Sequence, residues 1–234
     1  METPNQRAGK AGGLGAALKG VFSPAVLART YQDPLALANL GVDLLPVVAV
    51  LSFGWGAAPL VALYWLENLV IGVFTILRML AAGTQNGVFG LGGALFMSAF
   101  FTVHYGMFCF GHGVFLYTFA GHTDFPGPSE LVSWAAGSGA HMGLFLAAIA
   151  AVNLAVYLRD YIGRGEFRRT EISAEMGAPY GRIVTLHIAI ILGAGLTMGL
   201  GEPLLGVLLL IVLRVVFGMV LTVGRRLKLE GAGA

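Results

Sequence analysis

Apolar residues run along this chain in six long segments that are separated by short polar stretches. The segments lie near residues 35–54, 59–80, 92–119, 136–158, 182–200 and 203–224. Each is close to the roughly 20 residues that a helix needs to cross a hydrocarbon core of about 30 Å. The runs do not alternate between apolar and polar positions, which argues against a β-barrel. The pattern therefore predicts an all-α, polytopic membrane protein, a bundle of six transmembrane helices.

The composition supports this class of protein. Hydrophobic residues make up 57% of the chain and charged residues 11%, with a mean hydropathy of +0.81. A soluble domain carries about 25% charged residues. The net charge of +2 comes from few groups and does not indicate a nucleic-acid partner. A single cysteine, Cys109, excludes an internal disulfide and a paired-cysteine metal site. The first 20 residues lack the apolar core of a cleavable signal peptide.

Basic residues predict the orientation, because they accumulate in cytoplasmic loops. They flank one side of the predicted bundle: Arg7, Lys10, Lys19, Arg29, Arg78, Arg159, Arg164, Arg168, Arg169, Arg182, Arg225, Arg226 and Lys228. The other three loops contain no Lys or Arg. We therefore expect both termini in the cytoplasm and the bundle in a bacterial or archaeal inner membrane. Residues 1–33 form a cytoplasmic tail with an interfacial helix near 21–33, residues 34–224 the transmembrane domain, and residues 225–234 a second tail.

Ionisable side chains inside a bilayer are costly unless they are paired, so they are the default functional candidates. In the predicted helices these are Asp43, Glu67, His104, His112, His187 and Arg214, accompanied by Asn39, Asn68, Tyr105, Cys109 and Asn153. Counting the helical rise from the outer ends puts Glu67 and His112 in one layer. Asp43, His104, His187 and Arg214 fall in a deeper layer.

The third segment carries a polar stripe at helical spacing. Its members are Ser98, Thr102, Tyr105, Cys109 and His112. Such a stripe must face protein or a water-filled cavity. In the second segment, Tyr64, Glu67, Asn68, Thr75 and Arg78 share a broad polar face. We expect an outward-facing polar site built from Glu67, Asn68, Tyr105, Cys109 and His112.

The chemistry of these residues leaves several interpretations open. Glu67 is a hydrogen-bonded helix contact, a proton or cation site, or a metal ligand together with His104, His112 and His187. His104 and His187 share one depth, which axial ligation of a haem would require. Arg214 is expected to pair with Asp43 or Glu67. Cys109 is expected to be a small packing residue.

Several enzyme templates are absent from the sequence. No Glu-x-x-His pair marks a di-iron site, and no His-Glu-x-x-His helix marks a zinc site. The sequence therefore favours a role other than catalysis. Three functions remain: a membrane protein that binds a transition metal or haem, a small ion or solute transporter or channel, and an accessory subunit of a larger, bioenergetic membrane complex. The last would use protein partners or a homo-oligomer.

Two motifs resemble those of an uncharacterised family of multi-pass prokaryotic membrane proteins. One is Tyr64-Trp65-Leu66-Glu67-Asn68, and the other is the run from His104 to Gly113, HYGMFCFGHG. The likeness extends over about residues 35–225. The resemblance implies one membrane domain and singles out Glu67, His104, His112 and His187. It implies no activity, because none is known for such a family.

Overall fold

The structure is a computed structural model that describes residues 23–181, 183–184 and 203–231 of the 234-residue chain. All elements in these ranges are helical, which confirms the all-α class for the described part. The chain divides into two compact units. One consists of residues 1–43 and 214–234, and the other of residues 44–213.

The first unit contains α2 (Pro24–Thr30), the start of α3 (Pro34–Phe53) and the end of α10 (Pro203–Gly231). Helix α2 lies within the predicted interfacial segment 21–33. The Ser23 hydroxyl caps it by accepting the Val26 N–H at 3.3 Å. Helix α10 begins at Pro203, where the sixth apolar segment was expected to start, and a proline there lacks the N–H that a first helical position cannot use. It continues to Gly231, beyond the predicted end at 224.

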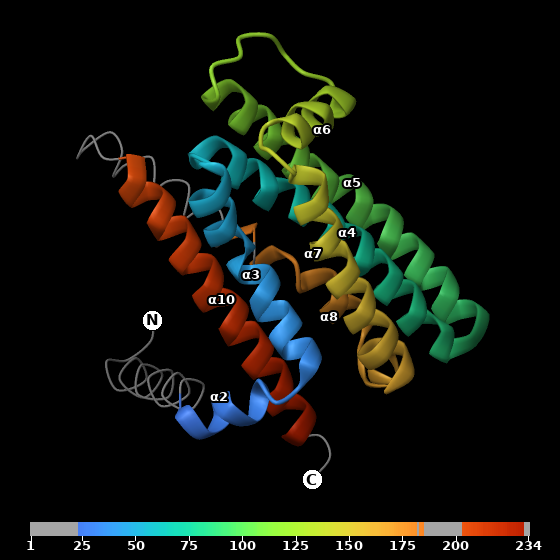
Figure 1. The fold of residues 1–234 in the computed structure, drawn as a ribbon. Helices are drawn as coiled ribbons and strands as arrows, with labels where there is room; N and C mark the ends of the chain where they lie inside the picture. Colours follow the sequence, from blue (N-terminus) through green and yellow to red (C-terminus); the bar gives the residue numbers. More distant parts are fainter. Residues whose placement is uncertain (1–22, 182, 185–202, 232–234) are drawn as a thin grey trace, which may run out of the picture. The chain divides into compact units, whose positions relative to one another are not determined.

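The second unit is built around α4 (Ala57–Gly83) and α5 (Gly87–Phe119), joined by the short 3₁₀-helix η1 (Thr84–Asn86). Figure 1 shows α4 and α5 side by side. Gly87 has φ +61°, a conformation that suits glycine, and it turns the chain between the two helices. A Cβ on Gly83 would lie 2.4 Å from that of Ala94, so the helices approach closely beside the turn. Helix α5 therefore starts earlier than the predicted residue 92.

The predicted helix 136–158 is interrupted, which corrects that expectation. Helix α6 (Pro128–Gly137) ends before α7 (Met142–Val156) begins, and a π-helical turn, η2 (Tyr157–Gly163), continues α7. His141 lies between α6 and α7 in the left-handed region with φ 60°. Gly139 lies against the Trp55 ring, where a Cβ would come within 2.6 Å of an indole carbon. The break therefore coincides with tight packing against Trp55, which hydropathy does not reveal.

Helix α4 is the central helix of the second unit. It contacts α5, α6, α7 and the short α8 (Ile172–Gly177), and also the 3₁₀-helix η3 (Glu166–Arg169). Its residues 62–68 are all buried. A helix covered on every side in this way positions its polar residues in the interior of the unit. By contrast, α5 buries only one face.

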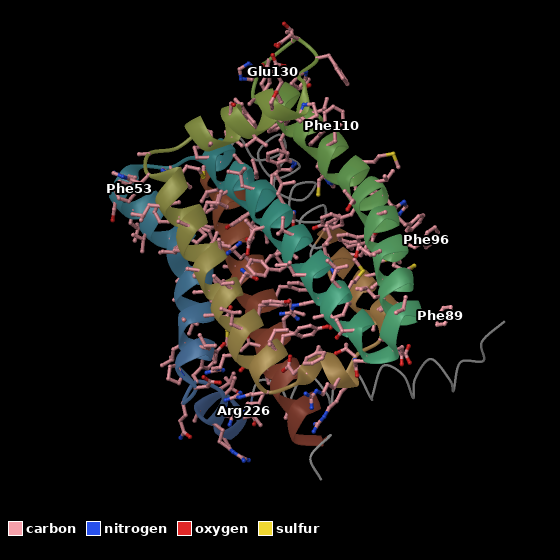
Figure 2. The ribbon with its side chains drawn as sticks, turned by 90° about the vertical axis from the view of Figure 1, so that its right-hand side faces the viewer. Phe53, Phe89, Phe96, Phe110, Glu130 and Arg226 are labelled. Carbon is pink, nitrogen blue, oxygen red and sulfur yellow. The ribbon has the colours of Figure 1, made fainter. Side chains whose placement is uncertain are left out.

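Three described helical stretches are long and apolar enough to cross a membrane. They are Pro34–Phe53, Ala57–Phe119 and Met142–Gly163, and the second contains both α4 and α5. Most of the predicted segment 182–200 lies outside the described residues. Figure 2 shows Phe89 and Phe96 on the outer side of α5, and these side chains are 94% and 70% exposed. A phenylalanine surface of this kind suits a lipid environment.

Candidate functional site: the polar centre between α4 and α5

The first predicted motif, Tyr64-Trp65-Leu66-Glu67-Asn68, lies in the fully covered part of α4. All five residues are at least nine-tenths buried, and Glu67 is 5% exposed. Thr75, about two helical turns beyond Asn68 on α4, is also buried. Its hydroxyl donates to the Ile71 carbonyl at 2.9 Å within its own helix. The polar face that the sequence predicts on this segment is therefore interior, from Tyr64 to Thr75.

Two hydrogen bonds between the helices set the register of α4 against α5. The Trp65 indole Nε1–H donates to the Cys109 carbonyl at 2.7 Å. The Tyr105 hydroxyl donates to the Asn68 carbonyl at 3.1 Å. Both bonds are buried, so each is satisfied within the protein rather than by water. Their order along the two helices shows that α4 and α5 are antiparallel and that Glu67 lies between the two bonded positions of α4.

Glycines let aromatic rings fill this contact. A Cβ on Gly113 of α5 would lie 2.8 Å from Trp65, and a Cβ on Gly72 of α4 would lie 3.0 Å from the Tyr105 ring. Neither distance leaves room for a larger residue without movement. The rings of Trp65 and Tyr105 are therefore fixed against the opposite helix, on either side of the level of Glu67.

The buried line on α5 differs from the predicted stripe. It consists of Ala94, Ser98, Phe101, Tyr105, Cys109, Gly113 and Leu116. Thr102, a predicted member, is exposed, and its hydroxyl donates to the Ser98 carbonyl at 2.8 Å. Because that hydroxyl is satisfied within its own helix, Thr102 does not need a buried position. His112 is half-buried, with its Nδ1 3.1 Å from the Phe108 carbonyl.

Tyr105 and Cys109 belong to a cluster of buried side chains on the side of the site facing α8. The cluster contains Met79, Phe101, Tyr105, Cys109 and Ile183, and it is covered by Leu69, Ile76, Met97, Ile172, Met176 and Tyr180. The Tyr180 ring stands edge-on to Tyr105 with 6.0 Å between centroids. Burial raises the pKa of the Tyr180 phenol, and the nearby Cys109 adds to the rise.

The residues predicted for the deeper layer fall in different units. Arg214 and Asp43 lie 3.5 Å apart in the first unit, so Arg214 has one of its two expected partners. Both side chains are about nine-tenths buried. Gly218 abuts the Asp43 carboxylate, where a Cβ would come within 2.0 Å of an oxygen. The ion pair therefore requires a glycine at residue 218, one helical turn from Arg214 on α10.

His104 belongs to the second unit and is surrounded by aromatic rings. It stacks on Phe100 at 5.5 Å, meets Phe108 edge-on at 5.3 Å, and lies 6.1 Å from Tyr180. Among the residues that the structure describes, no three His, Cys, Asp or Glu side chains are placed to hold a metal ion. His187 lies outside those residues. A metal or haem site that includes His187 stays a prediction.

Sequence reasoning missed a polar cluster on the side that carries the basic loop. Glu175 of α8 lies 3.9 Å from Arg78 of α4, and the Arg78 guanidinium lies 4.9 Å from the centre of the Tyr161 ring. Asp160, which is 6% exposed, pairs with Arg159 at 2.7 Å and with Arg164 at 3.1 Å. The signal was present in the sequence as acidic residues within the basic loop.

Comparison with known proteins gives the chain a family and no activity. No curated protein and no solved structure matches it. The sequence pattern of a family of unknown function, DUF6498, matches residues 25–233, which is nearly the whole chain. This agrees with the resemblance to an uncharacterised family. That the motifs at residues 64–68 and 104–113 are signatures of this family stays a prediction. The chain belongs to the DUF6498 family, a family of unknown function.

Proposed function

We propose that this chain is a multi-pass inner-membrane protein that binds a proton or a small monovalent cation at Glu67. The observation that carries the proposal is the position of this carboxyl group, which is 5% exposed in the part of α4 that other helices cover completely. A carboxylate in such a place is costly unless it holds a proton, a cation or a polar partner. Exchange of a proton or cation is the chemistry that this residue type supplies.

The surroundings of Glu67 support the proposal. Tyr64 and Asn68 are buried beside it on α4, and the Tyr105 hydroxyl of α5 donates to the carbonyl of Asn68. Hydroxyl and amide oxygens are the neighbours that a small cation or a proton relay uses. The rings of Trp65 and Tyr105 fill the α4–α5 contact beside this stretch of α4. A transporter or channel would connect this site to both sides of the membrane, whereas a sensor or accessory subunit would connect it to one.

The membrane topology is part of the same proposal. Six spans with both termini in the cytoplasm agree with the segregation of Lys and Arg described above. The antiparallel α4 and α5 are consistent with two consecutive spans. Fusions of a reporter that is active only inside the cell, and of one that is active only outside, test this arrangement. Placed after residues 84 and 232, the inside reporter should be active, and placed after residue 124 the outside reporter should be active.

The test of the site uses a carbodiimide, which reacts with protonated carboxyl groups in apolar surroundings. Purified protein in detergent is treated with dicyclohexylcarbodiimide, and the modified residue is located by peptide mass spectrometry. We expect modification at Glu67, slowed by the cation that the site binds or by raised pH. Glu67→Gln should abolish it at that position, whereas Asp124→Asn, at an exposed carboxylate, should not change it.

A flux measurement then distinguishes binding from transport. Wild-type and Glu67→Gln proteins are reconstituted into liposomes that contain a pH-sensitive or Na⁺-sensitive dye. A flux that is present in the wild type and lost in the variant establishes transport. Carbodiimide modification without flux restricts the protein to a binding or accessory role. Absence of both modification and flux in folded protein would refute a titratable site at Glu67.

A further inference from the structure

The segment from η2 to α8 folds back over the end of α4 and is fastened there by several polar contacts. The Tyr161 hydroxyl donates to the Arg78 carbonyl at 3.0 Å, and the Tyr157 hydroxyl donates to the Leu77 carbonyl at 3.4 Å. The Gln85 amide donates to the Phe167 carbonyl. These contacts join two parts of the chain that are about 80 residues apart in sequence. They hold the loop against the helix that carries Glu67.

The side chain of Arg78 links this segment to α8. Its guanidinium group contacts both the Tyr161 ring and the Glu175 carboxylate. Glu175 is 7% exposed, so the pair is largely shielded from water on the acidic side. The nitrogen–oxygen separation is 3.9 Å and the Arg78 side chain is 25% exposed, so water reaches the basic partner of the pair. An ion pair with one partner open to water can exchange its partner for water.

Helix α8 has only six residues, too few to be stable without tertiary contacts. Its apolar side provides those contacts at the α4–α5 centre. Ile172 and Met176 pack on the cluster that contains Tyr105 and Cys109, and Tyr180 follows directly against Tyr105. The short helix and Tyr180 therefore cover the polar centre from the side of the basic loop. Movement of α8 would uncover Tyr105 and Cys109 first.

We propose that α8 with Tyr180 is a gate over the polar centre, and that the Arg78–Glu175 ion pair is its latch. The inference rests on the proposed function, because the gate would admit a proton or cation to Glu67 from the side of the basic loop. Release of the latch needs only a change at Arg78, near the end of α4, or at Glu175 of α8. Neither residue lies in the buried middle of α4, which carries Glu67. The gate thus regulates access without altering the site itself.

The single cysteine of the chain reports on the gate. Cys109 is 3% exposed and lies in the cluster that α8 covers. In detergent-purified full-length protein we measure the rate at which N-ethylmaleimide modifies it. The wild type should react slowly, and Glu175→Gln should react about tenfold faster, because the rate follows the population of the open state. Tyr180→Ala should have the same effect without touching the ion pair.

Three comparisons make this result specific. Glu171→Gln changes an exposed carboxylate next to the start of α8 and should leave the rate unchanged. The charge exchange Arg78→Glu with Glu175→Arg should restore a rate near that of the wild type. A gel-filtration profile like that of the wild type, with rapid labelling only after addition of SDS, shows that each variant is folded. If the variants were simply unfolded, the labelling rate of Cys109 would rise in all of them, including the double charge-exchange variant.

A folded Glu175→Gln protein that reacts at the wild-type rate would overturn the gate. So would a charge exchange that stays fast while Glu171→Gln stays slow, since the pair would then have no specific role. These outcomes are independent of Glu67. If carbodiimide modifies Glu67 but Glu175→Gln leaves the maleimide labelling rate of Cys109 unchanged, the proposed site at Glu67 is supported and the proposed gate is wrong. If Glu175→Gln raises the labelling rate of Cys109 but carbodiimide does not modify Glu67, α8 does move and the proposed cation site is wrong.

Discussion

The indole Nε1–H of Trp65 on α4 donates a buried hydrogen bond of 2.7 Å to the backbone carbonyl of Cys109 on α5. This bond fixes where two long apolar helices meet, in a contact that offers few other polar groups to define a register. It also places the Trp65 ring against Gly113, one turn further along α5. The consequences of this arrangement can be measured.

Replacement of Trp65 by Phe should lower the free energy of unfolding by about 1–3 kcal/mol. The change removes a buried hydrogen bond and part of a ring that is packed against α5. Unfolding in mixed micelles with increasing SDS gives the value. Trp134→Phe is the matched control, because Trp134 is only half-buried, in α6. An equal fall in the free energy of unfolding for the two variants would show that the interhelical hydrogen bond makes no specific contribution to stability.

Substitution of Gly113 by Ala should destabilise the protein, whereas Gly111→Ala should not. A Cβ at residue 113 would lie 2.8 Å from Trp65 and 2.9 Å from Leu131, while nothing lies within 4 Å of one at residue 111. Overpacking of this kind costs about 1–3 kcal/mol. Thermal unfolding followed by circular dichroism compares the two variants. Tolerance of alanine at both positions would contradict the close helix contact.

Removal of one member of the buried Asp43–Arg214 pair should be more damaging than removal of both. Arg214→Gln leaves a buried carboxylate without its cation, for which about 3–5 kcal/mol is expected. The double variant Asp43→Asn with Arg214→Gln should recover much of that loss. The SDS unfolding series, arranged as a double-mutant cycle, measures the coupling. Additive losses would mean that the two residues do not interact in the membrane.

A methyl group at residue 218 should mimic the loss of that ion pair. The Cβ of Gly218→Ala would come within 2.0 Å of an Asp43 oxygen, so the carboxylate must move away from Arg214. Gly224→Ala, on the same helix, meets nothing within 4 Å and serves as the control. We expect a clear fall in melting temperature for the first variant and none for the second. In an Asp43→Asn background the effect of Gly218→Ala should shrink.

The sequence alone determined the all-α class and the approximate positions of α3, α4, α5 and α10. Apolar runs of about 20 residues have few alternatives to a helix, and the structure confirms the predicted helix start at Pro203. Sequence reasoning also selected Glu67, Asn68, Tyr105 and Cys109 as interior polar residues, and all four are buried. Ionisable and polar residues are costly in an apolar helix, and so they stand out there.

Only the tertiary structure decided which faces of these helices are buried. Helices α4 and α5 are both apolar around most of their circumference, because a side that faces lipid looks like a side that faces protein. Hydropathy therefore could not show that residues 62–68 of α4 are buried on every side, whereas α5 is buried on one face. Nor could it predict the break at His141 or the latch between Arg78 and Glu175. These features arise from close packing and from contacts between distant parts of the chain, which no local pattern records.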